Sequence, residues 1–106
     1  MKLLSRIEEI ILLAILRLEG NAYGVPIREQ VSKVTKKNWT FGAIYVPLDK
    51  LTQKEYISKY MSEPSANRGG RSKCLYRLTP EGKEALREIR QVNEALWENI
   101  PGVAFD

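Results

Sequence analysis

The residues with the clearest chemical potential lie in a glycine-rich basic loop. Between residues 63 and 73, the cations Arg68, Arg71 and Lys73 flank the pair Gly69-Gly70. Guanidinium and ammonium groups bind phosphate oxygens, and glycine lets a backbone approach a ligand closely. The loop therefore has the composition of a polyanion contact. An ordinary surface turn with solvated charges is the alternative interpretation of this segment taken alone.

Catalytic and metal-binding chemistry has little support in the sequence. The 106 residues include no histidine, which removes the most common general base and the most common zinc ligand. The single cysteine, Cys74, cannot form an internal disulfide or complete a thiolate metal site. Neither a glycine-rich phosphate loop nor a nucleophile elbow is present. We therefore expect a protein that is not an enzyme and needs no cofactor or metal.

Composition and charge predict one small domain with an anionic partner. Hydrophobic residues make up 43% of the chain and charged residues 28%, as in folded globular proteins. Residues 1–78 carry 14 Lys or Arg against 7 Asp or Glu, whereas residues 79–106 carry 3 against 6. A basic body with an acidic tail fits a polyanion that contacts only the first part. The longest apolar run is too short to cross a bilayer, and the lone cysteine favours a reducing cytoplasm.

Two helices are predicted in the first third of the chain. Ser5 and Glu8 form a capping box, which starts a helix over about residues 6–19. That helix is apolar around most of its circumference, so we expect it to be buried on two sides. A second helix should run from about Tyr23 to Thr35.

A third helix is expected after a cationic turn. Thr40 is its expected N-cap, and Pro47 falls beyond its first turn. A proline there should kink the helix or delay its regular start. The inward-facing apolar stripe consists of Ile44, Leu48 and Leu51.

A hairpin and a fourth helix complete the predicted order. Residues 56–61 and 73–78 have the pattern of antiparallel strands joined by the basic loop. Thr79 as N-cap and Pro80 in the first turn start a helix that should end at Pro101-Gly102. The expected fold class is mainly α with a small β wing (α+β). We expect the chain to divide into a domain over residues 1–78 and a C-terminal dimerisation helix with its tail over residues 79–106.

Three short helices followed by a basic hairpin are typical of the winged helix-turn-helix, a DNA-binding fold. Its third helix enters the major groove, and the hairpin loop, or wing, contacts the adjacent backbone or minor groove. The first turn of the third helix lacks Arg, Asn and Gln, so thymine methyl contacts or DNA shape should contribute more than bidentate hydrogen bonds. For Tyr45, packing of this helix against the wing is an equal alternative. The expected DNA contacts are Tyr23, Lys36, Lys37, Thr40, Gly42, Ala43, Tyr45, Lys50, Arg68, Arg71 and Lys73, with Lys54 as a further phosphate contact.

The fourth helix has an apolar face wider than the small hairpin can cover. A two-fold homodimer, in which the first and fourth helices bury each other's apolar faces, is the simplest solution and predicts a roughly palindromic DNA site. Trp97 either packs in that interface or, with Asn93, lines a pocket for a small aromatic effector. The expected interface residues are Ile7, Ile11, Leu86, Ile89, Val92, Asn93, Leu96, Trp97 and Ile100.

Several of these segments together resemble the PadR family of bacterial transcriptional regulators. Ala22-Tyr23-Gly24 is similar to the start of that family's second helix, and residues 42–51 are similar to its recognition helix. Residues 68–82 resemble its wing and the start of its C-terminal helix. The resemblance implies a homodimeric repressor that leaves its operator when a small, often aromatic or cationic, molecule binds.

A winged-helix module that binds another protein, without specific DNA readout, is the competing hypothesis. Salt dependence distinguishes the two functions, because a protein that contacts several phosphates loses affinity for DNA steeply as salt rises.

Overall fold

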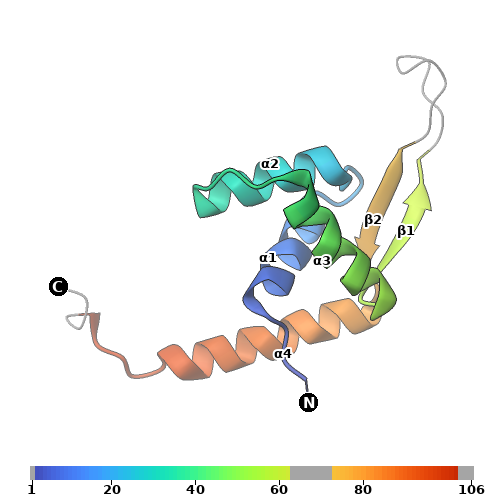
Figure 1. The fold of residues 1–106 in the computed structure, drawn as a ribbon. Helices are drawn as coiled ribbons and strands as arrows, with labels where there is room; N and C mark the ends of the chain where they lie inside the picture. Colours follow the sequence, from blue (N-terminus) through green and yellow to red (C-terminus); the bar gives the residue numbers. More distant parts are fainter. Residues whose placement is uncertain (1, 63–72, 103–106) are drawn as a thin grey trace.

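Four helices and one antiparallel hairpin form the described part of the chain, residues 2–62 and 73–102 of this computed structural model (Figure 1). The predicted α+β class and the order of its elements are confirmed. No helix among these residues is long and apolar enough to span a membrane. The elements are α1 (Arg6–Arg17), α2 (Gly24–Thr35), α3 (Phe41–Gln53), β1 (Ile57–Met61), β2 (Cys74–Leu78) and α4 (Pro80–Trp97).

Side-chain caps fix where three of the helices begin. The Ser5 hydroxyl accepts a hydrogen bond from the Glu8 amide at 3.2 Å, and the Glu8 carboxylate accepts one from the Ser5 amide at 2.8 Å. The predicted capping box is therefore confirmed. Thr40 and Thr79 cap α3 and α4 through their hydroxyls, as expected.

Some element ends differ from the prediction by a few residues. α1 ends at Arg17 rather than near residue 19, ahead of Gly20 with its positive φ of 87°. α4 ends at Trp97 rather than at Pro101-Gly102, because the backbone of Glu98 is already extended, with ψ of 133°. Each strand begins one residue later than predicted.

Pro47 lies inside α3 without delaying its start. The helix runs from Phe41 to Gln53, because Thr40 caps it well ahead of the proline. The predicted delay therefore does not occur. A proline at this position removes the amide that would pair with the Ala43 carbonyl one turn earlier. Ala43 is exposed, so water can satisfy that carbonyl.

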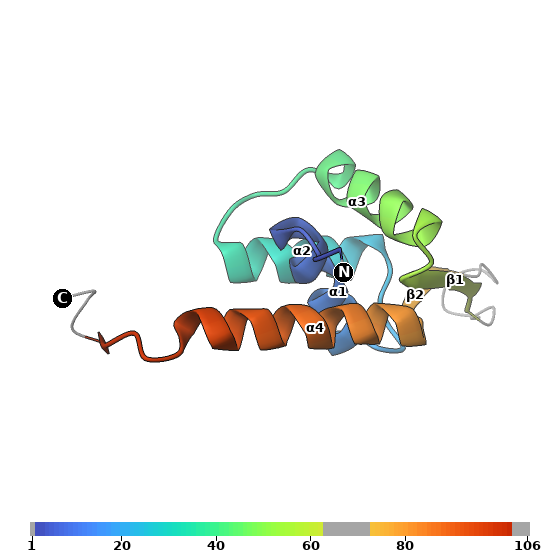
Figure 2. The same cartoon turned by 90° about the horizontal axis from the view of Figure 1, so that it is seen from below.

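Helix α1 forms the centre of the core. It lies between α4 on one side and α2 with α3 on the other (Figure 2). Ile11, Leu12 and Ile15 of α1 are fully buried. The apolar circumference of this helix is thus largely used within the single chain. The second half of α4, in contrast, extends past the other helices (Figures 1 and 2).

The hairpin is joined to the helical body at its base. β1 and β2 pair antiparallel, with Ile57 opposite Leu78 and Met61 opposite Cys74. The Tyr76 amide of β2 donates to the Ala22 carbonyl at 2.8 Å, which links the hairpin to the segment before α2. The loop between the strands, with the predicted wing cations Arg68 and Arg71, lies outside the described residues.

The start of α4 approaches the backbone before β1 closely. A Cβ on Gly82 would lie 2.0 Å from the carbonyl oxygen of Tyr56 and 3.0 Å from its carbonyl carbon. The Thr79 amide donates to the same Tyr56 carbonyl at 3.0 Å, and the Thr79 hydroxyl donates to the Glu55 carbonyl at 2.6 Å. These bonds hold the first turn of α4 where a side chain at residue 82 has no room.

Gly82→Ala should therefore lower the free energy of unfolding by about 1–3 kcal/mol, because the facing atoms belong to the backbone and cannot swing away. That figure is the net change: the steric cost should exceed the stabilisation of about 1 kcal/mol that replacing glycine by alanine brings to a helix. Gly42→Ala is the matched control, since a Cβ on this exposed helical residue meets nothing closer than 4.0 Å. Urea denaturation measures both variants. Equal stability of Gly82→Ala and the parent protein would contradict the close approach.

Candidate nucleic-acid interface

The first turns of α3 present small and aromatic side chains to solvent. Gly42 and Ala43 are exposed, and Phe41 and Tyr45 expose 43% and 41% of their surfaces. The two rings stack, with their centroids 6.2 Å apart and an interplanar angle of 27°. On the inner side of α3, the predicted stripe is confirmed as fully buried: Ile44, Leu48 and Leu51.

Tyr45 packs against the start of α2. A Cβ on Gly24 would lie 2.0 Å from the Tyr45 hydroxyl oxygen and 2.7 Å from the adjoining ring carbon. The glycine therefore lets the tyrosine ring settle against α2. This contact is with α2, whereas the packing alternative from the sequence placed Tyr45 against the wing.

The base of the hairpin contacts the same end of α2. The Lys73 ammonium lies 3.8 Å from the centroid of the Tyr23 ring, a cation–π contact. Tyr23 occupies the N-cap of α2, but its side chain makes no capping hydrogen bond. The first turn of α2 also contains no acidic residue. The amides of Gly24 and Val25 thus suit an external anion, whereas Pro26 has no amide hydrogen.

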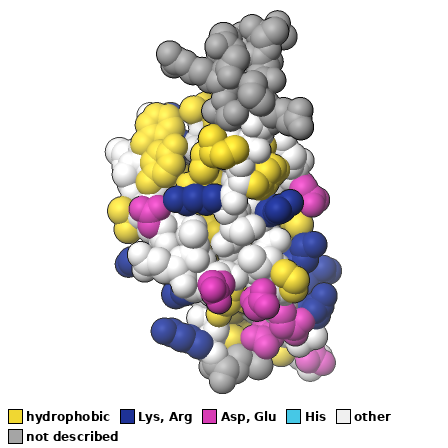
Figure 3. Space-filling view, turned by 90° about the vertical axis from the view of Figure 1, so that its right-hand side faces the viewer, with side chains coloured by type: hydrophobic (Ala, Val, Ile, Leu, Met, Phe, Trp, Pro, Cys, Tyr) yellow, Lys and Arg dark blue, Asp and Glu magenta, His cyan; other side chains and the backbone are white. Residues whose placement is uncertain are grey.

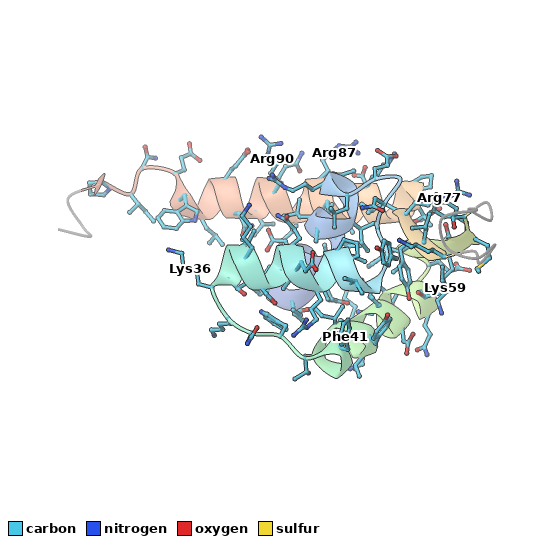
Figure 4. All side chains as sticks on the ribbon, turned by 90° about the horizontal axis from the view of Figure 1, so that it is seen from above. Lys36, Phe41, Lys59, Arg77, Arg87 and Arg90 are labelled. Carbon is cyan, nitrogen blue, oxygen red and sulfur yellow. The ribbon has the colours of Figure 1, made fainter. Side chains whose placement is uncertain are left out.

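Basic side chains around the hairpin and the start of α3 lie on aromatic rings. A ring attracts a cation through its quadrupole but does not neutralise the charge. Figure 4 shows Lys59 and Arg77 on the hairpin strands and Phe41 where α3 begins beside α2. Measured from cation to ring centroid, the pairs are Lys73 on Tyr23 (3.8 Å), Arg28 on Phe41 (4.7 Å), Arg77 on Tyr60 (4.7 Å) and Lys59 on Tyr76 (6.0 Å).

The two arginines of α4 have carboxylate partners instead. Arg87 pairs with Glu84, and Arg90 pairs with Glu94 at 2.9 Å. Figure 4 shows Arg87 and Arg90 along α4, on the side away from Phe41. In Figure 3, hydrophobic side chains gather in the upper part of the described surface, basic side chains lie at mid-height and below, and most acidic side chains lie in the lower part. Around the hairpin and the start of α3, the described cations with printed partners are therefore held by rings rather than by carboxylates.

The ring beside Lys59 is buried. Burial, with smaller contributions from the nearby Cys74, Tyr45 and Asp49, raises the pKa of Tyr76 to about 12. At neutral pH its phenol is uncharged, as that of an ordinary tyrosine also is, so it gives Lys59 no opposite charge.

The other lysines predicted to contact phosphate differ in their surroundings. Lys50 is exposed on α3, and Lys36 and Lys37 are exposed at the end of α2 that points away from the hairpin (Figure 4). Lys54 was also expected to contact phosphate, but its ammonium donates to the Glu8 carboxylate and is thereby held against α1.

Two consecutive carboxylates of α1 connect it to α3 and α4. Burial raises the pKa of Glu8, but hydrogen bonds from Lys54 and Ser5 outweigh that effect and hold the pKa below its ordinary value of 4.5. The neighbouring Glu9 accepts a hydrogen bond from the Asn93 amide of α4 at 2.9 Å. Asn93, expected at an interface or effector pocket, is thus engaged by its own chain.

A groove of about 560 Å³ lies between α1 and α4. Its apolar lining consists of Leu13 and Leu16 of α1 and Leu86 and Trp97 of α4. The polar and charged lining residues are Glu9, Lys83, Arg87, Arg90, Asn93 and Glu94. Trp97 exposes 61% of its surface, and both α1 leucines are exposed too. The groove therefore joins exposed apolar surface from both helices predicted to dimerise.

The predicted interface residues fall into three groups. Leu96, Trp97 and Ile100 are exposed, Ile7, Val92 and Asn93 are half-buried, and Leu86 and Ile89 are buried against the core. Ile11 is a correction: its exposure is 0%, so it belongs to the core of the single chain and offers no surface to a second copy.

Two exposed leucines of α1, Leu13 and Leu16, were not among the predicted interface residues. They lie on the face of α1 left over once Ile11, Leu12 and Ile15 take the core positions. Helical periodicity would have identified them if the core face had been known.

Comparisons with known proteins converge on one family. The model of the Transcriptional regulator PadR-like family matches residues 12–88. A PadR family transcription regulator from Clostridium difficile R20291 is 32% identical with a TM-score of 0.60, covering 82% of this chain and 88% of that one. A PadR-like transcription factor from Bacteroides fragilis is 25% identical with a TM-score of 0.68, covering 87% and 84%.

A third structure supports the fold alone. RosR from H. salinarum is 21% identical with a TM-score of 0.66, covering 92% of this chain and 81% of that one. The comparison with curated proteins finds no match. Within the described residues, no group of three His, Cys, Asp or Glu side chains is arranged to hold a metal ion.

Glu8→Gln should lower the free energy of unfolding at pH 7 by about 1–2 kcal/mol, because the amide cannot balance the Lys54 charge. The folded-state pKa of Glu8 is lowered, so its carboxylate contributes stability above pH 4.5 that is lost as pH falls through the folded value. The gap between variant and parent should therefore shrink at pH 3. Urea denaturation at both pH values measures it. Glu84→Gln, in an exposed ion pair, is the control and should change stability little.

Proposed function

This chain belongs to the PadR-like family of transcriptional regulators, and from that premise we propose that it is a homodimeric repressor bound to a roughly palindromic operator. Its family consists of transcriptional regulators rather than enzymes. The observation that carries the proposal is that cations at the base of the hairpin and beside the exposed first turns of α3 lie on aromatic rings rather than on carboxylates. Such a surface attracts a polyanion and has room for one to approach.

In the proposed complex, the first turns of α3 enter the major groove. Gly42 and Ala43 let the helix backbone approach the base edges, because neither carries a bulky side chain. Thr40 and Tyr45 flank them with hydroxyl groups. The Thr40 oxygen accepts the Ala43 amide at 3.1 Å, which leaves its proton available to a phosphate.

Phosphate contacts would surround that helix. The start of α2 offers uncapped amides beside Tyr23, and Lys73 lies directly over the Tyr23 ring. Lys50 is exposed further along α3, and Lys36 and Lys37 would meet the backbone on the other side. Arg68 and Arg71 would enter the adjacent minor groove, whose negative potential suits arginine.

The groove between α1 and α4 would be covered by a second copy. The exposed side chains Leu13, Leu16, Leu96 and Trp97 are apolar, and α4 extends beyond its own domain, where a partner is within reach. Burial of apolar surface of this kind is the main favourable term in protein association. A two-fold axis there would pair two α3 helices for successive turns of DNA.

We propose that a small aromatic effector also uses this groove. The Trp97 ring supplies a flat surface for stacking, and Glu9 with Asn93 supplies polar groups nearby. An effector between the two copies would alter the spacing of the α3 helices and so release the operator. This finer role depends on the dimer.

Mobility-shift titration of the DNA upstream of the protein's own gene tests DNA binding. Affinity should fall by about 100-fold between about 50 and 200 mM salt, since several phosphates are contacted. Lys73→Ala should weaken binding several-fold and reduce the salt slope by about one. The double variant Arg68→Ala with Arg71→Ala should lose more affinity and stay dimeric.

Lys33→Ala is the matched control for charge, because Lys33 lies on the opposite side of α2 from Gly24 and should leave affinity nearly unchanged. Binding that is weak at every salt concentration and indifferent to Lys73, Arg68 and Arg71 would favour the competing function, a module that binds another protein.

Leu13→Glu should convert the dimer to a monomer without unfolding the chain, because the side chain is already exposed in the single copy. A buried charge in the interface would cost far more than one in water. Sedimentation or light scattering gives the mass, and circular dichroism confirms folding. Val46→Glu, at an equally accessible aliphatic position on α3, should remain dimeric. A monomeric parent protein at micromolar concentration would contradict the dimer.

A further inference from the structure

The recognition helix begins with an exposed aromatic residue that the sequence patterns did not single out. Phe41 is the first residue of α3 and leaves 43% of its surface in solvent. It lies on the α3 side of the molecule, away from the α4 arginines that border the dimerisation groove (Figure 4). A large apolar side chain at this place therefore needs a role outside the core and outside the groove.

The Phe41 ring has two contacts that restrict it. It stacks with Tyr45, and the Arg28 guanidinium lies 4.7 Å from its centroid. Tyr45 is itself positioned against Gly24, one helical turn before Arg28. Both contacts come from the α2–α3 pair, so the orientation of the ring is fixed by the helix-turn-helix itself.

Arg28 is anchored as well. Its Nε donates to the Trp39 carbonyl, in the segment that precedes α3. The Trp39 amide donates to the Ser32 hydroxyl at 3.3 Å, and the Trp39 indole donates to the Thr35 hydroxyl at 2.7 Å. The guanidinium is thus tied to a backbone segment that α2 holds at two points. An ordered arginine of this kind restricts the ring on which it lies.

A rigid phenyl edge at the start of the recognition helix has one specific use in the major groove. It forms no strong hydrogen bonds, so it cannot read the donor and acceptor pattern of a base pair. It can pack against the 5-methyl group of thymine, the only apolar group that B-DNA presents there. The first turn of α3 offers no Arg, Asn or Gln that would compete for the same position.

We propose that Phe41 is a specificity-determining residue that packs against a thymine methyl group in each half of the operator, with Arg28 as its positioning residue. The inference rests on the proposed function, since it requires α3 to lie in the major groove. Arg28 acts through the ring: it keeps the phenyl edge directed outwards, where a free side chain would collapse onto α2 or α3.

The test replaces thymine by deoxyuridine, which removes only the methyl group. Duplexes selected from a randomised pool by the parent protein supply the binding site, and each thymine is then substituted in turn. At one thymine per half-site, the substitution should weaken binding about fourfold, the value of one buried methyl group. Phe41→Ala should bind the thymine duplex more weakly and should not distinguish thymine from uracil there.

Arg28 is tested by the ratio of the two affinities. Arg28→Ala should lower the thymine-to-uracil ratio towards one, whereas Arg28→Lys, which keeps a cation for the ring, should restore part of it. A residue that only stabilised the fold would change both affinities equally and leave the ratio intact. An unchanged ratio in Arg28→Ala would overturn the positioning role.

The outcomes separate this inference from the proposed function. Parent protein that selects a duplex, binds it with steep salt dependence and ignores every uracil substitution would overturn the role of Phe41 and leave the regulator intact. Failure to select any duplex would overturn the proposed function and, with it, this inference. The uracil comparison uses the parent protein, so it stays decisive even if Phe41→Ala does not fold.

Discussion

The burial of α1 on two sides, with a polar tie to each neighbour, is the constraint on which the other elements depend. Ile11, Leu12 and Ile15 fill the core, and beside them Glu8 bonds to α3 while Glu9 bonds to α4. A rotation of α1 about its axis would break both of these bonds and leave each carboxylate only its local partner, the Ser5 amide for Glu8 and the Arg6 guanidinium for Glu9. One helical turn therefore sets the positions of α3 and α4 together.

Features decided within about four residues of the chain could be predicted from the sequence. The capping box at Ser5 and the caps at Thr40 and Thr79 depend on neighbours three residues away, and all three helices begin where these signals place them. Contacts between crossing elements were not predictable. Lys54 was expected to meet phosphate but pairs with Glu8, 46 residues away, because the angle between α1 and α3 brings them together.

The same limit applies to the candidate site. Small residues at the start of α3 were recognisable, since type and position alone identify them. The Arg28–Phe41 pair was not, because it depends on how the loop before α3 returns past α2. Ile11 was predicted at a dimer interface but is buried in the core of the single chain. A helix that is apolar all round gives no sign of which face its own domain will bury.

A cation that lies on an aromatic ring differs from one in an ion pair in how its partner responds to pH. A carboxylate partner takes up a proton in acid and so changes the local field, whereas a phenyl or neutral phenol ring does not. The chain also lacks histidine, the side chain whose ordinary pKa falls between about pH 5 and 8. The rings therefore hold these cations in place without a carboxylate whose protonation would alter the field that a polyanion meets.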